Sequence, residues 1–205
     1  PERYTTEYAV EPDFGDCRKT ANKAARDSWR SLHEGAEHIT SDDAETIKRM
    51  VAAVHKHPLA SRMIADGKPE LTLRWTDEDS GLPCKARADY YVERLGAVFD
   101  VKSTLDARPK AFQKDVHNYR YHVQDALYRS AFAANKIDVR HFAFICVEKE
   151  LPHAIAIYEL DPDAVARGLA AARRNIETMK QCMFSGKWPG YSESIQTIQL
   201  PPWAA

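Results

Sequence analysis

Two aspartates and a lysine lie close together in the middle of the sequence, at Asp89, Asp100 and Lys102. They fall within or just after two apolar runs rich in aromatic and β-branched residues, 86–92 and 97–101, which predict two strands joined by a polar, glycine-containing turn. Side chains alternate along a strand, so Asp100 and Lys102 are predicted to share one face. If the two strands pair, Asp89 comes beside Asp100, within reach of a shared ion.

Carboxylates and an ammonium at the end of an apolar hairpin are costly unless something pairs with them, and a divalent cation is the simplest partner. Mg²⁺ prefers one or two carboxylates, several waters and phosphate oxygens. The carbonyl of Val101, whose side chain is predicted to point into the core, would be a further oxygen ligand. Lys102 would then orient or deprotonate a water, or stabilise charge on phosphorus. These residue types indicate metal-dependent phosphodiester hydrolysis, although on spacing alone a solvated, salt-bridged hairpin edge is the commoner explanation.

Two further elements must position these groups. Residues 70–75 alternate strictly between polar and apolar types and predict a strand, which together with the hairpin gives a three-stranded antiparallel meander. A helix is predicted over 118–135, where Gln124 and Tyr128 are four residues apart and share a face. If this helix packs over the sheet, Gln124 holds the lysine or the attacking water. An ordinary surface amide is the alternative.

Two groups of side chains that could bind a ligand have a simpler explanation. His55 and His57 lie near the end of a predicted helix, where caps or C-terminal cations are commoner than metal ligands. The tyrosines that flank the predicted site favour core packing over a base-stacking platform; they are Tyr119, Tyr121 and Tyr128.

The order of helices and strands predicts an α/β fold, with a mixed central β-sheet flanked by helices. Helices are expected over 18–34, from 41 to about 57, and from 162 to about 184, with a short helix that follows Pro58 and runs to residue 65. Further strands are expected over 141–147 and 154–160, with a last edge strand over 195–200. Residues 1–16 read as an extended lead-in, and 109–115 as a single helical turn.

With 205 residues, 44% of them hydrophobic and 29% charged, the chain can bury one core. A single domain over 1–205 is predicted, with a helical N-terminal part, 1–66, and a catalytic core, 67–205. The formal net charge is −1, so nucleic acid would have to be bound by a local surface or an enclosed channel. The four cysteines form no C-x-x-C pair, which favours reduced thiols in a cytoplasm. No membrane span or signal peptide is visible and the first residue is Pro, so a cytoplasmic fragment of a longer polypeptide is expected.

Several segments, taken in order, resemble the C-terminal nuclease domain of the RecE exonucleases (exonuclease VIII), within the PD-(D/E)xK superfamily that also includes lambda exonuclease. The likeness covers most of the chain and rests on Trp75–Asp77, Gly81–Asp89, Phe99–Thr104, Asn118–Tyr128, Trp188–Pro189 and Leu200–Trp203. Asn118–Tyr128 is the most specific of these segments. Together they outweigh the salt-bridge explanation of the hairpin.

The resemblance implies a restriction-endonuclease-like core and a Mg²⁺-dependent 5′ to 3′ exonuclease, with Mn²⁺ as a substitute ion. Such an enzyme degrades the ends of double-stranded DNA in recombination and repair, here in a phage or prophage. The resemblance also implies a ring-shaped homo-oligomer, a trimer or tetramer, and a single-strand annealing partner of the RecT type.

The same resemblance implies roles for individual residues. Asp89 and Asp100 would be metal ligands, with the Val101 carbonyl, and Lys102 the catalytic lysine. Gln124 and Tyr128 would form the catalytic motif on the following helix. The secondary acidic candidates are Glu70 and Asp77, and the expected DNA contacts are Ser103, Thr104, Arg120 and Tyr121.

The sequence departs from the superfamily pattern in three places. Ala88 replaces the usual proline, and Asp100 the commoner glutamate. The family places a further metal ligand, His or Glu, on an upstream helix. No residue here matches it, and the chain is expected to begin just after it.

Two other classes of function remain open. One is a structure-specific or restriction-type endonuclease on the same core. The other is a non-catalytic module that binds DNA or an annealing protein.

Overall fold

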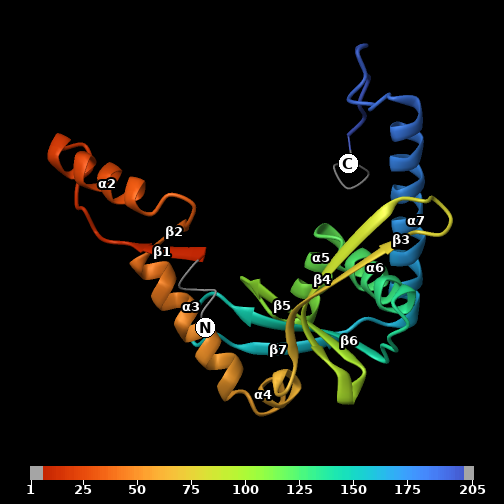
Figure 1. Cartoon of the computed structure of the whole chain (residues 1–205), viewed down its shortest axis with the longest axis horizontal. Helices are drawn as coiled ribbons and strands as arrows, with labels where there is room; N and C mark the ends of the chain where they lie inside the picture. Colours follow the sequence, from red (N-terminus) through yellow and green to blue (C-terminus); the bar gives the residue numbers. More distant parts are fainter. Residues whose placement is uncertain (1–6, 201–205) are drawn as a thin grey trace.

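The computed structural model describes residues 7–200 and is built around a five-stranded sheet (Figure 1). Its strands lie in the order β3 (Lys68–Thr76), β4 (Pro83–Val92), β5 (Ala97–Thr104), β6 (His141–Glu148) and β7 (Ile155–Glu159). Neighbouring strands are antiparallel except β5 and β6, which are parallel. The predicted meander and the predicted mixed sheet are both confirmed.

Helices cover both faces of this sheet. The parallel β5–β6 pair requires a crossover, and α5 (Pro109–Asn118) and α6 (Tyr121–Ala134) supply it while covering one face. The other face is covered by α3 (Ser41–Lys56) and α4 (Pro58–Ile64). The long helix α7 (Pro162–Ser185) packs against α6 (Figure 1). The fold is therefore the α/β class expected from the order of elements.

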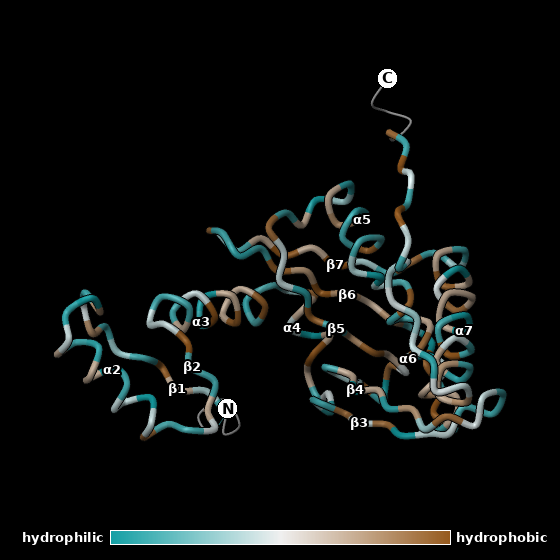
Figure 2. The backbone as a smooth tube through the Cα atoms, turned by 90° about the horizontal axis from the view of Figure 1, so that it is seen from above, coloured by the Kyte–Doolittle hydropathy of each residue, from teal (hydrophilic) through white to brown (hydrophobic). Residues whose placement is uncertain are grey.

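The sheet has an apolar cluster on each face, and Figure 2 shows hydrophobic residues concentrated along its strands. On the α5–α6 side, rings of Phe112, Phe132, Phe142 and Phe144 fill the core. Alternate residues of β5 and β6 fill the α3–α4 side. Two carboxylates are also among the fully buried side chains, Asp100 and Asp125. A buried charge is costly unless it is paired, and each of these acids has a basic partner, Lys102 for Asp100 and Arg129 for Asp125.

The sequence predicts a helical N-terminal part, but the structure also contains two short strands there. β1 (Tyr8–Glu11) and β2 (Glu37–Thr40) form a separate two-stranded parallel sheet, with α2 (Thr20–Leu32) between them in the chain. In Figure 1 this arm extends away from the central sheet, and α3 joins the two. Strands of four residues carry too little periodicity to be recognised from sequence. Residues 1–6 of the predicted lead-in lie outside the described part of the chain.

Three smaller predictions are settled by the structure. α5 is a ten-residue helix with proline in its first turn, rather than a single turn. His57 is a cap, as expected, but its side chain caps the start of α4 and not the end of α3, by accepting a hydrogen bond from the backbone N–H of Ala60. The edge strand predicted over 195–200 is wrong, since this described segment forms no strand and Ile195 is fully exposed.

Two other points concern the chain as a whole. The Pro201–Trp203 part of the closing motif lies outside the described residues. Within residues 7–200, no helix combines the length and apolar character needed to cross a membrane.

Candidate active site

The backbone pairing of β4 and β5 ends at Tyr90 and Phe99, and Asp89 is the next residue of β4 beyond it. The ladder between the two strands covers three residue pairs. Beyond it the Asp89 side chain takes over, because its Oδ2 accepts a hydrogen bond from the N–H of Val101 at 2.9 Å. Asp89 therefore holds β5 where the two strands begin to diverge.

Asp100 is far more buried than the sequence indicated, with 1% of its surface exposed. Its Oδ1 accepts a hydrogen bond from Nε2 of Gln124 at 2.6 Å, and its Oδ2 lies 2.5 Å from Nζ of Lys102. No donor among the described residues reaches Oδ2 with hydrogen-bond geometry. Burial first, and then the neighbouring Asp89 carboxylate, raise the pKa of Asp100 to about 6, against the opposing effect of Lys102.

The predicted alternation along β5 is present, and helices cover both faces of the strand. Asp100 and Lys102 both face α6, as their contacts with Gln124 show. This face is the more enclosed one. Val101 is only half-buried and lines a groove of about 320 Å³ between α3 and the other face of the sheet. Val101 thus packs against the apolar cluster on the α3–α4 side, as predicted, while Asp100 and Lys102 lie on the opposite face.

Lys102 is held from several sides. Its Nζ donates a hydrogen bond to Oε1 of Gln124 at 2.9 Å and lies 4.6 Å from the ring centroid of Tyr121. A cation over an aromatic face is stabilised by the ring quadrupole. Gln124 thus bridges the ammonium and the Asp100 carboxylate through its two amide atoms, which is the role predicted for it. Tyr121, predicted to contact DNA, supports the lysine instead.

Tyr128 lies one helical turn after Gln124 and contacts the strand backbone. Its hydroxyl donates a hydrogen bond to the carbonyl of Arg87 at 2.9 Å, and burial raises the pKa of this hydroxyl. Arg87 is two residues before Asp89 in β4. The contact ties α6 to β4 next to the acid, so Tyr128 helps to position the strand that carries Asp89.

The two secondary acids lie at opposite ends of the β3–β4 ladder. Glu70 falls across from Asp89, in a left-handed conformation with φ +55°, and forms an ion pair of 2.9 Å with Arg87. Asp77 lies at the other end, buried, where it pairs with Arg173 of α7 and accepts hydrogen bonds from Ser80. The Ser80 hydroxyl is the main cause of the lowered pKa of Asp77. Asp77 therefore anchors the β3–β4 loop and does not join the site.

The expected DNA contacts divide in the same way. Thr104 is buried and its hydroxyl donates to Oδ2 of Asp115 at 3.0 Å, so the predicted contact with DNA is corrected. Ser103 lies in the groove beside α3, on the opposite face from Lys102. Arg120 is exposed at the start of α6. Of the four residues, Ser103 and Arg120 remain accessible.

The residues present fit a hard divalent cation. The Asp89 carboxylate lies close enough to Asp100 to oppose its ionisation, which a cation bound between them would relieve. No group of three His, Cys, Asp or Glu side chains able to hold a metal ion occurs within residues 7–200. Mg²⁺ suits such a sparse set, because it keeps several waters and takes substrate phosphate oxygens.

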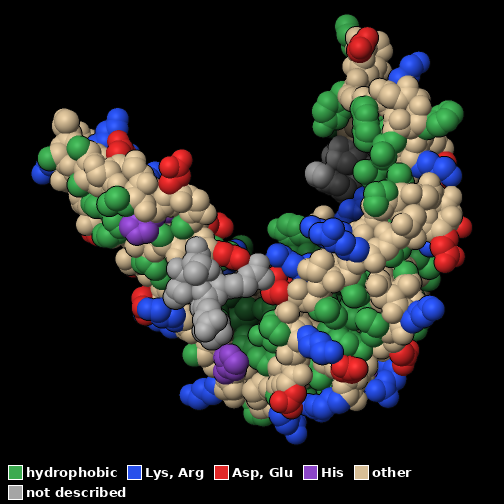
Figure 3. All heavy atoms as spheres, viewed as in Figure 1, with side chains coloured by type: hydrophobic (Ala, Val, Ile, Leu, Met, Phe, Trp, Pro, Cys, Tyr) green, Lys and Arg blue, Asp and Glu red, His purple; other side chains and the backbone are tan. Residues whose placement is uncertain are grey.

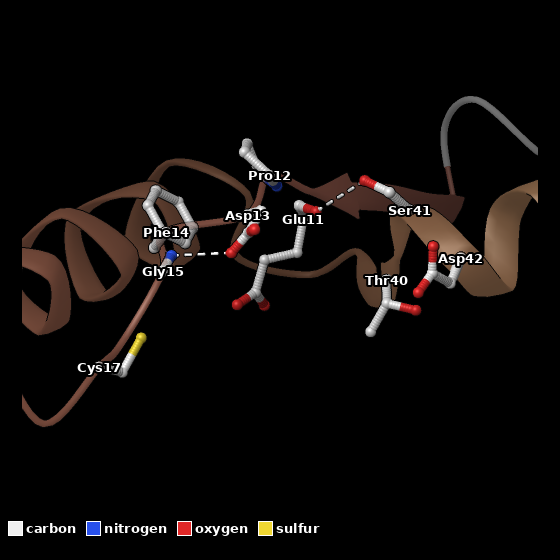
Figure 4. Close-up of a pocket in the computed structure, with 9 residues that line it drawn as sticks. All are labelled: Glu11, Pro12, Asp13, Phe14, Gly15, Cys17, Thr40, Ser41 and Asp42. Atoms are coloured by element: carbon white, nitrogen blue, oxygen red, sulfur yellow. Dashed lines mark hydrogen bonds between the residues drawn. The ribbon is translucent and has the colours of Figure 1, made fainter.

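A second acidic hollow, of about 340 Å³, lies in the N-terminal arm (Figure 4). Glu11, Asp13 and Asp42 line it together with Thr40 and Ser41. Its acids are already engaged or spread apart, since Glu11 pairs with Arg30 at 2.8 Å and Asp13 accepts from the N–H of Gly15. None of the predicted site residues lies there.

The molecule is deeply notched between the N-terminal arm and the part that carries α7 (Figure 3). In the same view β5 and α5 lie beneath this notch (Figure 1). The side chains of Asp100 and Lys102 themselves point toward α6.

Two ion pairs of buried aspartates were not identified from sequence. Arg173 reaches Asp77 across 96 residues, and no local pattern indicates such a pair. Asp125, next to Gln124, is fully buried and bound by Arg129 at 2.6 Å. Its four-residue spacing from Arg129 on a predicted helix was the available signal.

A family profile described as a PDDEXK-like domain of unknown function (DUF3799) matches residues 7–201. A structure from Eubacterium rectale, provisionally named an exonuclease, has a similar fold, with a TM-score of 0.59 and 14% identity over 98% of this chain and 81% of that one. A phage-related exonuclease from Haemophilus somnus aligns with a TM-score of 0.42 and 14% identity, over 84% and 91% of the two chains. No curated protein matches the chain significantly. Because the profile spans nearly the whole length, the chain belongs to this PDDEXK-like family, within the PD-(D/E)xK nuclease superfamily.

Proposed function

We propose that this chain is a Mg²⁺-dependent deoxyribonuclease of the RecE type, which degrades double-stranded DNA ends in the 5′ to 3′ direction. The observation that carries the nuclease assignment is the buried Asp100, which lies beside Asp89 and is joined to Lys102 through Gln124. Exonuclease activity is supported by the motif resemblance and by the provisional name of the E. rectale protein of similar fold, and the 5′ to 3′ direction by the motif resemblance.

The chain's own residues supply most of the preorganisation. A bound Mg²⁺, held by Asp89 and Asp100, would activate the attacking water and neutralise charge on the scissile phosphate. Lys102 keeps an ammonium beside these acids, where it stabilises negative charge that develops on phosphate oxygens. Gln124 and the Tyr121 ring fix the position of that ammonium before substrate arrives. Asp89 and Tyr128 fix the ends of the strands that carry the acids.

The test uses linear duplex DNA labelled at either the 5′ or the 3′ end, together with closed circular duplex. We expect Mg²⁺ to support release of the 5′ label from linear DNA, while the circle stays intact and EDTA stops the reaction. Nicking of the circle would identify an endonuclease. A complete absence of cleavage with both Mg²⁺ and Mn²⁺ would contradict the assignment and favour a non-catalytic module.

Asp100→Ala is the matched inactive variant. It should lower cleavage by several orders of magnitude, because it removes a metal ligand and the partner of both Lys102 and Gln124. The circular dichroism spectrum should be unchanged. Near wild-type cleavage by this variant would show that any nuclease activity comes from another site or from a contaminant.

A further inference from the structure

One exposed aromatic ring is linked to the lysine of the site through a second ring. Tyr119 is 67% exposed and ends α5. Its ring stacks on Tyr121 with centroids 5.6 Å apart and planes at 25°. The Tyr121 ring in turn lies 4.6 Å from Nζ of Lys102. Tyr121 therefore has Tyr119 and Lys102 as neighbours, while most of the Tyr119 ring is open to solvent.

The turn that presents Tyr119 is held in an unfavourable backbone conformation. Arg120, between the two tyrosines, has φ +59° and ψ 37°, which a residue with a Cβ adopts at a cost. No side-chain hydrogen bond caps α6 at this residue, and Arg120 is exposed. The exposed Tyr119 ring and Arg120 guanidinium bury little surface, so this turn adds little to the stability of the fold. Such strain is concentrated at functional sites.

An aromatic face beside a phosphodiester-cleaving site has an obvious chemical complement. Nucleobases stack on exposed tyrosine rings regardless of sequence, and an adjacent arginine binds the neighbouring phosphate. α5, which leads into this turn, borders the notch seen in Figures 1 and 3.

We propose that Tyr119 is a stacking platform for a nucleobase of the strand being cut, and that Arg120 holds the phosphate next to that base. This inference rests on the proposed nuclease function and refines it. The platform acts on substrate binding and orientation, so its loss changes KM and the dissociation constant far more than kcat.

The direct test places 2-aminopurine, a fluorescent adenine analogue quenched by stacking, at each of the first four positions from either end of a duplex. Ca²⁺ replaces Mg²⁺ so that binding is read without cleavage. Wild type should quench one or two of these positions. Tyr119→Phe should keep the quench, and Tyr119→Ala should abolish it while weakening binding roughly fivefold or more. Tyr119→Leu, which keeps apolar area without an aromatic face, should behave like Tyr119→Ala.

A matched control and a double-mutant cycle complete the design. Tyr191→Ala removes a fully exposed tyrosine from the C-terminal segment and should change neither binding nor quenching. An abasic nucleotide at the quenched position should weaken wild-type binding by the same factor as Tyr119→Ala, with no further loss when both are combined.

The outcomes separate this inference from the proposed function. If wild type cleaves DNA in Mg²⁺ and Tyr119→Ala shows the same quench and affinity, the stacking role is refuted and the nuclease stands. Additive losses from the abasic nucleotide and Tyr119→Ala would also refute it, because they would place the base elsewhere. If wild type neither binds nor cleaves DNA, both proposals fail.

Discussion

Asp100 is the central residue of the proposed site, because it is a buried carboxylate between two polar partners. Its Oδ1 accepts a hydrogen bond from Gln124 and its Oδ2 pairs with Lys102 at 2.5 Å. A buried ion pair is often no more stable than apolar residues of similar volume, so its presence is weak evidence for a purely stabilising role. In the proposed function, this carboxylate would bind the cation.

Asp100 makes stability depend on pH in a direction opposite to that of most acids. Its folded pKa is raised to about 6 from the ordinary 3.8, so between these values the folded state binds more protons than the unfolded chain. The Asp100 contribution to folding free energy therefore falls as pH rises through this window. In EDTA, the melting temperature of Asp100→Asn should rise relative to wild type between pH 4 and pH 7. A difference that stays constant with pH would contradict the raised pKa.

Gln124 is predicted to act through its two neighbours rather than on substrate. Gln124→Ala frees Lys102 and Asp100 from a common support and should lower cleavage by about 10–100-fold, the usual effect of removing a supporting residue. Lys102→Ala should cost more, roughly 10²–10³-fold in kcat, because it removes charge at the reacting phosphate. Ser130→Ala, on the same helix, removes only a hydroxyl bonded to its own helix backbone and serves as the control. Equal losses for Gln124→Ala and Lys102→Ala would show that Gln124 has a direct role.

At the scale of elements, the position of α6 decides whether Gln124, Tyr121 and Tyr128 reach the sheet. α6 is held from behind by α7, which crosses it at Gly168. A Cβ added at Gly168 would lie 2.0 Å from the backbone carbonyl oxygen of His122, two residues before Gln124. Such a contact cannot be relieved by rotating a side chain, so α6 or α7 must move.

Gly168→Ala should therefore damage the site without touching it. We expect a loss of stability of about 1–3 kcal/mol, as for other overpacked positions, together with a fall in cleavage larger than the unfolded fraction explains. Gly190→Ala is the matched control, because nothing lies within 4 Å of a Cβ there. Measurement of the urea midpoint and of kcat on the same samples checks both effects. Full activity in a destabilised Gly168→Ala variant would show that α6 tolerates displacement.

The elements themselves were predictable where the sequence carries a strong local signal. β3 alternates strictly, β6 is a continuous apolar run, and α7 begins with a capping Asp161 followed by proline. β1 and β2 lack such a signal, because each is four residues long and pairs with a strand outside its neighbourhood. Within the site, spacing predicted that Asp100 and Lys102 share a face. It could not predict that this face is enclosed, since the burial comes from α6.

The interactions that were missed depend on the tertiary fold alone. The Asp89 side chain bonds the Val101 N–H because the backbone pairing of β4 and β5 ends at Tyr90 and Phe99. No residue pattern indicates where that pairing ends. The anchoring of Asp77 by Arg173 requires α7 to lie along the β3–β4 loop. An acidic residue near a predicted strand was therefore a sound candidate whose role only packing could decide.

At the scale of the whole molecule, metal binding should appear as stability. An ion that binds the folded state alone raises stability by about 2.7 kcal/mol at a hundred times its dissociation constant. Mg²⁺ should therefore raise the melting temperature of wild type, and Asp89→Asn should suppress most of the rise. Asp42→Asn, in the acidic hollow of the N-terminal arm, should leave it intact. The reverse result would place the cation in the arm.

Asp89 performs two duties with a single short side chain. One oxygen holds the neighbouring strand by accepting a hydrogen bond from the Val101 amide. In the proposed function, the other oxygen would bind the incoming ion. Position 89 is consequently constrained in side-chain length as well as in charge. Glutamate would lose either the hydrogen bond to Val101 or the ion, and asparagine would keep only the hydrogen bond. A replacement at position 89 should therefore weaken the strand contact as well as the proposed metal site.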